Sequence, residues 1–276
     1  MIETGLAALL GLLLGSFLNV CIHRMPRDES VVWPGSRCPA CGHGIASWDN
    51  IPLLSFVLLG GRCRHCFARI SWRYPLVEAA SALLLAMVVM TGGPGLGAVK
   101  YGLFALLTLG MIVSDIETRI LPDEFTLGGL AAGLALAPVA PAGGGFPGFV
   151  FPQAPAWGLG LLDAALGAGL ASGSLWAVAA VYNRVRHREG LGFGDVKMVA
   201  MIGAFLGVAG AMAAIFLGCV AGTVVGVAWI VTKKKKASEY ELPFGTFLGA
   251  AALFEAFRAE GLLRWYWGLG PAGFGG

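Results

Sequence analysis

Eight long apolar runs constrain the fold of this 276-residue chain more than any other feature of its sequence. Most of them are near the roughly 17–25 residues that a helix needs to cross a bilayer. Charged residues make up only 13% of the chain, against about 25% in a typical soluble domain. The sequence therefore predicts an all-α polytopic membrane protein with about eight transmembrane helices. The runs lie at residues 4–22, 76–92, 98–114, 122–140, 159–182, 195–209, 211–232 and 244–262, and the sixth and seventh meet without a polar break.

The distribution of lysine and arginine predicts how these helices are oriented. If the N-terminus lies outside, fifteen of the nineteen basic residues fall on the cytoplasmic side, where such an excess is expected. The first run contains Glu3 and follows no basic region, so we expect a retained helix and no cleaved signal. We interpret the lysines at 233–236 as a topology determinant, with a contact to anionic lipid as the alternative. The inside segments are then 22–75, 115–121, 183–194 and 233–243.

Four cysteines in the first inside segment predict a metal site. Two C-x2-C pairs, with 21 residues between them, are typical of a zinc ribbon, because each pair points two thiolates at one tetrahedral ion. Two disulfides are the alternative, but these are rare in a reducing cytoplasm. We therefore predict three parts: a first transmembrane helix at 1–22, a zinc-binding domain at 23–75 and a seven-helix membrane domain at 76–276. The expected ligands are Cys38, Cys41, Cys63 and Cys66.

Two aspartates are expected at the same depth in the membrane. Asp115 ends the third apolar run and Asp195 opens the sixth, so both lie at the cytoplasmic boundary in the predicted topology. Ionisable residues in such positions are functional candidates. Two facing carboxyl groups can share a proton while one activates a water molecule, as in aspartic proteases. Gly192 and Gly194 would let an extended substrate approach Asp195. The alternative is that each aspartate caps a helix or marks the interface.

Six sequence motifs, in the same order along the chain, resemble those of the bacterial prepilin peptidases. They are "GSFLNVCIHRMP" at 15–26, the two cysteine pairs flanking "WDNIPLLSFVLLGGR", "YPLVE" at 74–78, "DIETRILPD" at 115–123, "GFGDVK" at 192–197 and "PFGTFLGA" at 243–250. The resemblance covers nearly the whole chain. It departs from the family pattern at Thr246, where proline is usual, and at Glu117, where aspartate is frequent.

The resemblance implies an intramembrane aspartyl protease of the GxGD type in the bacterial inner membrane. It implies Asp115 and Asp195 as the catalytic pair and prepilins and type II secretion pseudopilins as substrates. Inner-membrane lipid is the other expected partner, and no nucleic acid is expected. We take Gly192, Gly194 and Lys197 as candidates for binding the substrate.

A second activity is implied as well, the methylation of the new N-terminus with S-adenosylmethionine. Gly61, Arg62 and Glu78 match family positions and are our candidates for binding this methyl donor. The sequence contains no Rossmann-type fingerprint, because "GGPGLG" at 92–97 follows a membrane helix and not a strand. Two alternatives stay open: a peptidase without methyltransferase activity, and a non-enzymatic, ion-coupled transporter whose zinc ribbon docks a partner.

Overall fold

All the regular secondary structure in the described part of the chain is helical. The computed structural model describes residues 1–140, 145–187, 191–233 and 243–268, and it has no strand within these ranges, only two isolated bridges. This confirms the predicted all-α class. The lysines at 234–236 and most of the predicted inside segment 233–243 lie outside the described residues.

Each of the eight apolar runs falls on a helix. Five helices are long and apolar enough to cross a membrane, as expected of a multi-pass protein. The runs at 195–209 and 211–232 both lie in α8, which a kink divides into two parts, and two others lie in the shorter α5 and the apolar part of α9. The long helices are α1 (Ile2–Arg24), α3 (Arg73–Gly92), α4 (Leu96–Thr118), α5 (Asp123–Leu136), α7 (Ala156–Arg186), α8 (Phe193–Lys233) and α9 (Phe244–Gly268), and the short ones are α2 (Leu54–Leu58) and α6 (Gly145–Val150).

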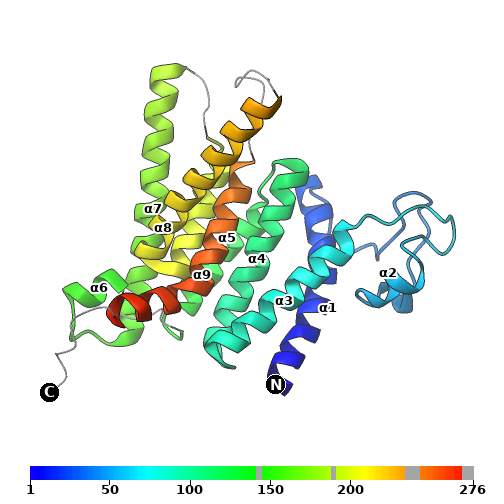
Figure 1. Ribbon diagram of the computed structural model, residues 1–276, viewed down its shortest axis with the longest axis horizontal. Coiled ribbons are helices and arrows are strands. Elements are labelled where there is room, and N and C mark those ends of the chain that lie inside the picture. Colours follow the sequence, from blue (N-terminus) through cyan, green and yellow to red (C-terminus); the bar gives the residue numbers. More distant parts are fainter. Residues whose placement is uncertain (141–144, 188–190, 234–242, 269–276) are drawn as a thin grey trace.

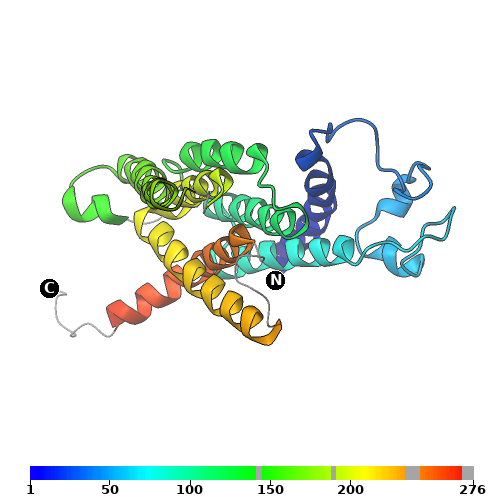
Figure 2. The same ribbon diagram turned by 90° about the horizontal axis from the view of Figure 1, so that it is seen from above.

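The long helices pack in an order that brings distant parts of the chain together. α1 lies against α3, α3 against α4, and α4 against α9, while α8 contacts α5, α7 and α9 (Figures 1 and 2). Small residues allow the closest approach, as is common between membrane helices. A β-carbon at Gly11 of α1 would lie 2.6 Å from the backbone of Ala82 in α3. The centre of the bundle is fully buried and apolar, with Phe104, Met111, Met198, Met201 and Phe205.

Helix α8 is broken at Gly207, near the junction of the sixth and seventh predicted runs. Gly207 has φ +70° and ψ −172°, which is not helical and which a residue with a side chain rarely adopts. The carboxylate of Asp163 in α7 occupies the space that a β-carbon at Gly207 would need. It also accepts a hydrogen bond from the Val208 N–H at 3.4 Å. A buried aspartate therefore satisfies a backbone donor that the helix break exposes.

The segment between α1 and α3 projects from one end of the molecule, opposite α6 (Figures 1 and 2). It contains α2 and two short 3-10 turns, η1 (Met25–Arg27) and η2 (Ser47–Asn50). We refer to residues 28–72 as the cysteine segment. Its fold depends on turns and side-chain contacts, because it has few regular elements of its own.

Candidate functional site

Asp115 lies in the last turn of α4, where its carboxylate meets the start of α9. The residue is only 5% exposed. Its Oδ2 accepts a hydrogen bond from the Thr246 backbone N–H at 2.7 Å and another from the Thr246 hydroxyl at 2.9 Å. Gly245 makes this approach possible, because a β-carbon there would lie 3.2 Å from the carboxyl group. The first turn of α9 therefore fixes the orientation of Asp115.

Asp195 lies in the first turn of α8 and is partly buried. Its backbone N–H donates to the Gly192 carbonyl oxygen at 3.1 Å, which closes the turn before the helix. Gly194 directly precedes Asp195, and Gly245 lies against the Asp115 carboxyl group. Leu121 links the two sides, because β-carbons at Gly194 and Gly245 would each lie 3.3 Å from its side chain. The folded chain thus brings together the two predicted aspartates.

The three candidate substrate-binding residues all lie near Asp195, but their exposure and their contacts differ. Gly192 is exposed, and a β-carbon there would lie 3.5 Å from Asp195 Oδ2. Gly194 is partly buried against Leu121. Lys197 forms an ion pair with Asp123 at 2.6 Å, which ties the start of α5 to the first turns of α8. The exposed glycine therefore lies where a substrate backbone could approach the dyad.

The four cysteines of the two C-x2-C pairs form one cluster. Their sulfur atoms all lie within 4.8 Å of one another. Four thiolates bound to a tetrahedral zinc at about 2.3 Å would be about 3.8 Å apart, and Cys38 Sγ and Cys66 Sγ are 3.8 Å apart. The donor set therefore fits a zinc ion.

Two turns with matching hydrogen bonds build this cluster. The Cys38 N–H donates to the His43 carbonyl oxygen at 2.9 Å, and the Cys63 N–H donates to Ala68 at the same distance. Each turn ends in an isolated antiparallel bridge, Arg37 with Gly44 and Arg62 with Arg69. The two pairs thus lie in turns with the same local structure, and together these turns bring the four thiol groups into one cluster, as a tetrahedral ion requires.

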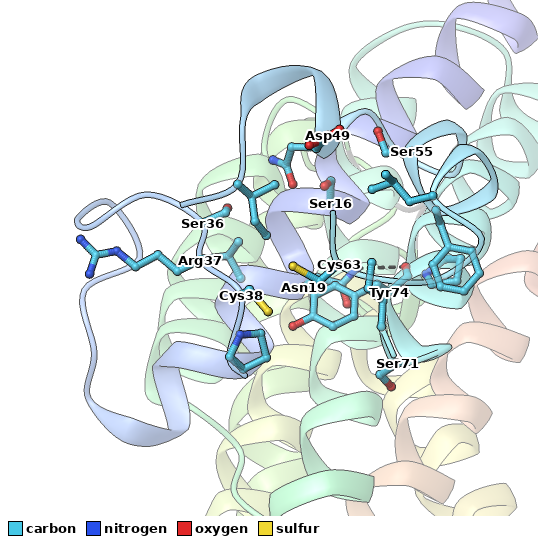
Figure 3. A pocket seen from close by; sticks show the side chains of 18 of the residues that line it. Ser16, Asn19, Ser36, Arg37, Cys38, Asp49, Ser55, Cys63, Ser71 and Tyr74 are labelled. Atoms are coloured by element: carbon cyan, nitrogen blue, oxygen red, sulfur yellow. Dashed lines mark hydrogen bonds between the residues drawn. The ribbon is translucent and has the colours of Figure 1, made fainter. Parts of the chain in front are cut away.

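A cavity of about 470 Å³ lies where the cysteine segment meets α1 and α3 (Figure 3). Glu78 of α3 lines it and is buried, and its Oε2 accepts a hydrogen bond from the Leu53 N–H at 2.8 Å. Gly61 and Arg62 are not among its lining residues. Gly61 instead contacts Phe56, which does line the cavity, and a β-carbon at Gly61 would lie 3.1 Å from that ring. Of the three candidates for binding the methyl donor, Glu78 therefore lines the cavity, whereas Gly61 and Arg62 do not.

Sequence reasoning missed two residues of these sites. In the sequence, Thr246 stands out only as a departure from the family pattern. No neighbouring residue in the sequence indicates its contact with Asp115. Asn19 lies within the motif "GSFLNV" but is uncharged and surrounded by apolar residues. It is 1% exposed and lines the cavity. A buried amide in an apolar helix was the available signal, because such a group needs hydrogen-bond partners.

Comparisons with known proteins match two successive parts of the chain to family models. Residues 9–91 match the bacterial peptidase A24 N-terminal domain, and residues 101–227 match the type IV leader peptidase family. The first match includes all four cysteines, and the second includes both aspartates. No solved structure matches the chain.

Several curated relatives are similar over almost the whole chain. A prepilin leader peptidase/N-methyltransferase of Burkholderia pseudomallei is 35% identical, over 91% of this chain and 85% of the relative. Proteins of the same description from Aeromonas hydrophila and Pseudomonas aeruginosa are 34% and 35% identical, over 95% and 96% of this chain and 92% and 93% of the relatives. With the four clustered cysteines inside the first matched region and both aspartates inside the second, the chain belongs to the type IV leader peptidase family.

Proposed function

We propose that this protein cleaves the leader peptide from type IV prepilins and type II secretion pseudopilins. The observation that carries the proposal is that Asp115, at the end of α4, and Asp195, at the start of α8, lie on either side of Leu121. The similarity to curated prepilin leader peptidases supports the substrate class. Membership of a peptidase family argues against the alternative of a non-enzymatic transporter.

In this proposal the two aspartates activate a water molecule at the cytoplasmic membrane boundary. A shared proton lets one carboxyl group act as an acid while the other acts as a base. Asp115 Oδ2 already accepts two hydrogen bonds from Thr246, so it is not the oxygen that carries this proton. The proton and the water molecule are therefore held by Asp115 Oδ1 and by Asp195. The exposed backbone at Gly192 supports approach of the scissile peptide from that side.

The same protein would then methylate the new N-terminus with S-adenosylmethionine. The descriptions of the curated relatives name both activities. Zinc bound by Cys38, Cys41, Cys63 and Cys66 would hold the cysteine segment in its fold, because small metal domains draw folding free energy from the ion. We assign the first helix to residues 1–22, the zinc-binding domain to 23–75 and the protease domain to 76–276. Eight crossings with the N-terminus outside would bring both sites to the cytoplasmic face.

One reaction tests the proposal. Purified protein is incubated with a prepilin and S-adenosylmethionine, and the mass and N-terminal residue of the product are determined. We expect cleavage together with the addition of one methyl group. Cleavage without methylation would leave a peptidase only, and an unchanged prepilin would refute the proposed function.

Two variants and a matched control test the dyad itself. Asp115→Asn and Asp195→Asn should each abolish cleavage, because each removes one acid–base group. Glu124→Gln changes an exposed carboxylate in the first turn of α5 and should cleave at the wild-type rate. Near wild-type cleavage by either aspartate variant would refute the assignment.

A further inference from the structure

The cavity beneath the cysteine segment contains polar atoms that the protein itself does not satisfy. The amide nitrogen of Asn19 donates to the carbonyl oxygens of Gly15 and Tyr74, at 3.3 and 3.1 Å. This fixes the orientation of the amide and leaves Oδ1 buried without a partner among the described residues. A buried acceptor without a partner costs about 1–3 kcal/mol. Asn19 therefore indicates a ligand with a hydrogen-bond donor.

A second unsatisfied group lies on the same cavity wall. The guanidinium Nε of Arg73 is buried and has no partner among the described residues, although the Nη1 atom pairs with Glu117 at 2.6 Å. Both Arg73 and Glu117 line the cavity. The unsatisfied atom of Asn19 is an acceptor, whereas that of Arg73 is a donor on a positively charged group. The ligand should therefore have a hydrogen-bond acceptor as well as a donor.

The rest of the lining suits a molecule with apolar and charged parts. Glu78 supplies a buried carboxylate beside Ser16, and Phe56 and Tyr74 supply aromatic surface. Asn19, Tyr74 and Ser16 surround the same space in Figure 3. The volume of about 470 Å³ lies within the roughly 300–1,000 Å³ that is typical of small-molecule and cofactor sites. The ligand should therefore combine a flat ring, a cation and an anion.

We propose that this cavity is the binding site for S-adenosylmethionine, with Asn19 and Glu78 facing its cationic end and Arg73 facing its carboxylate. The inference rests on the proposed methyltransferase function and adds a location and binding residues to it. The lone pair of the pilin amine forms a bond to the methyl carbon, and the carbon–sulfur bond electrons return to sulfur. The products are the methylated amine and S-adenosylhomocysteine, and the displaced proton leaves to bulk water.

The position of the cavity explains how one substrate could use both sites. Glu117 lies on the cavity wall and only two residues after Asp115 along α4. The Arg73–Glu117 ion pair therefore joins the methyl-donor cavity on α3 to the helix end that carries the peptidase aspartate. A new N-terminus released at the dyad would have a short path to the methyl donor.

Binding of S-adenosylmethionine to the full-length protein tests this inference without relying on turnover. Calorimetry measures the dissociation constant, and ultraviolet crosslinking of the radiolabelled donor identifies the peptides that it contacts. We expect the label on residues 16–24, 49–56 or 69–78, which line the cavity. Glu78→Gln keeps the shape of the side chain and should weaken binding by roughly ten- to hundredfold, because it removes a charged partner. Asn19→Leu should weaken binding as well.

Asp115→Asn serves as the matched control, because it also replaces a buried carboxylate by an amide. It should bind the donor with the wild-type affinity although it cannot cleave. Zinc content and prepilin cleavage report whether the Glu78 and Asn19 variants are folded. Wild-type affinity in both variants, or label found only on α7, α8 or α9, would overturn the site. A wild-type protein that cleaves prepilin but does not bind the donor would overturn it too, while leaving the proposed peptidase intact.

Discussion

Thr246 donates two hydrogen bonds to the same carboxylate oxygen of Asp115, from its backbone N–H at 2.7 Å and from its hydroxyl at 2.9 Å. The two residues are 131 positions apart in the sequence, and the contact joins the end of α4 to the start of α9. It limits the rotation of the carboxyl group that, in the proposed mechanism, would hold a water molecule or a proton in place. Thr246 is thus a positioning residue for the proposed peptidase.

Replacing Thr246 by valine should slow cleavage without preventing substrate binding. Thr246→Val removes the hydroxyl and keeps the backbone donor, and a hydrogen bond to a charged group contributes about 1.5–3 kcal/mol. We expect kcat to fall by roughly ten- to hundredfold, with KM little changed. Steady-state cleavage of a prepilin peptide measures both constants. Thr246→Ser retains the hydroxyl and should recover most of the rate, whereas equal rates for valine and serine would exclude a role for the hydroxyl.

Loss of the cysteine cluster should affect the cysteine segment more than the bundle. Metal analysis of the wild type should give about one zinc per chain, and Cys38→Ser/Cys63→Ser should have none. Limited proteolysis should then cut residues 28–72 quickly and leave the helices protected, because the segment has few elements of its own. Binding of S-adenosylmethionine should also be lost, since both cysteines line the cavity. Four metal-free thiols in protein purified without chelators would contradict the zinc assignment.

A methyl group added at Gly207 should destabilise the bundle. Gly207→Ala places a β-carbon against the Asp163 carboxylate and in a left-handed conformation. Overpacking alone costs typically about 1–3 kcal/mol, and the backbone strain adds to it. A clear drop in the apparent Tm of the detergent-solubilised protein should follow. Gly173→Ala in α7 is the control, because nothing lies within 4 Å of a β-carbon there, and an equal Tm for both variants would refute the packing argument.

The leader junction of the substrate should lie next to the start of α8. Phe193 is 64% exposed and lies two residues before Asp195. A photoreactive residue at position 193 should therefore capture the prepilin near its cleavage site. Trp157, at the start of α7, is similarly exposed at 61% and provides the control position. Mass spectrometry of the crosslinked peptides measures this, and capture from position 157 alone would contradict the placement.

The sequence by itself determined the features that depend on short stretches of chain. Apolar length predicted the helices, and the spacing of Cys38, Cys41, Cys63 and Cys66 predicted their convergence, which the cluster confirms. The helix-end positions of Asp115 and Asp195 follow from the same runs. Hydropathy and spacing work here because each depends on residues that are near one another in sequence.

Only the tertiary structure decided which groups face one another across helices. Asp115 meets Thr246, Glu78 accepts from Leu53, and α3 and α4 are joined by Arg73 and Glu117. The cavity also depends on how α1 packs against α3, where glycines let the two backbones approach. Such contacts depend on the rotation and crossing of helices, and one apolar run resembles another in hydropathy whichever neighbour it packs against. The unsatisfied atom of Asn19 therefore becomes visible only once the surrounding helices are in place.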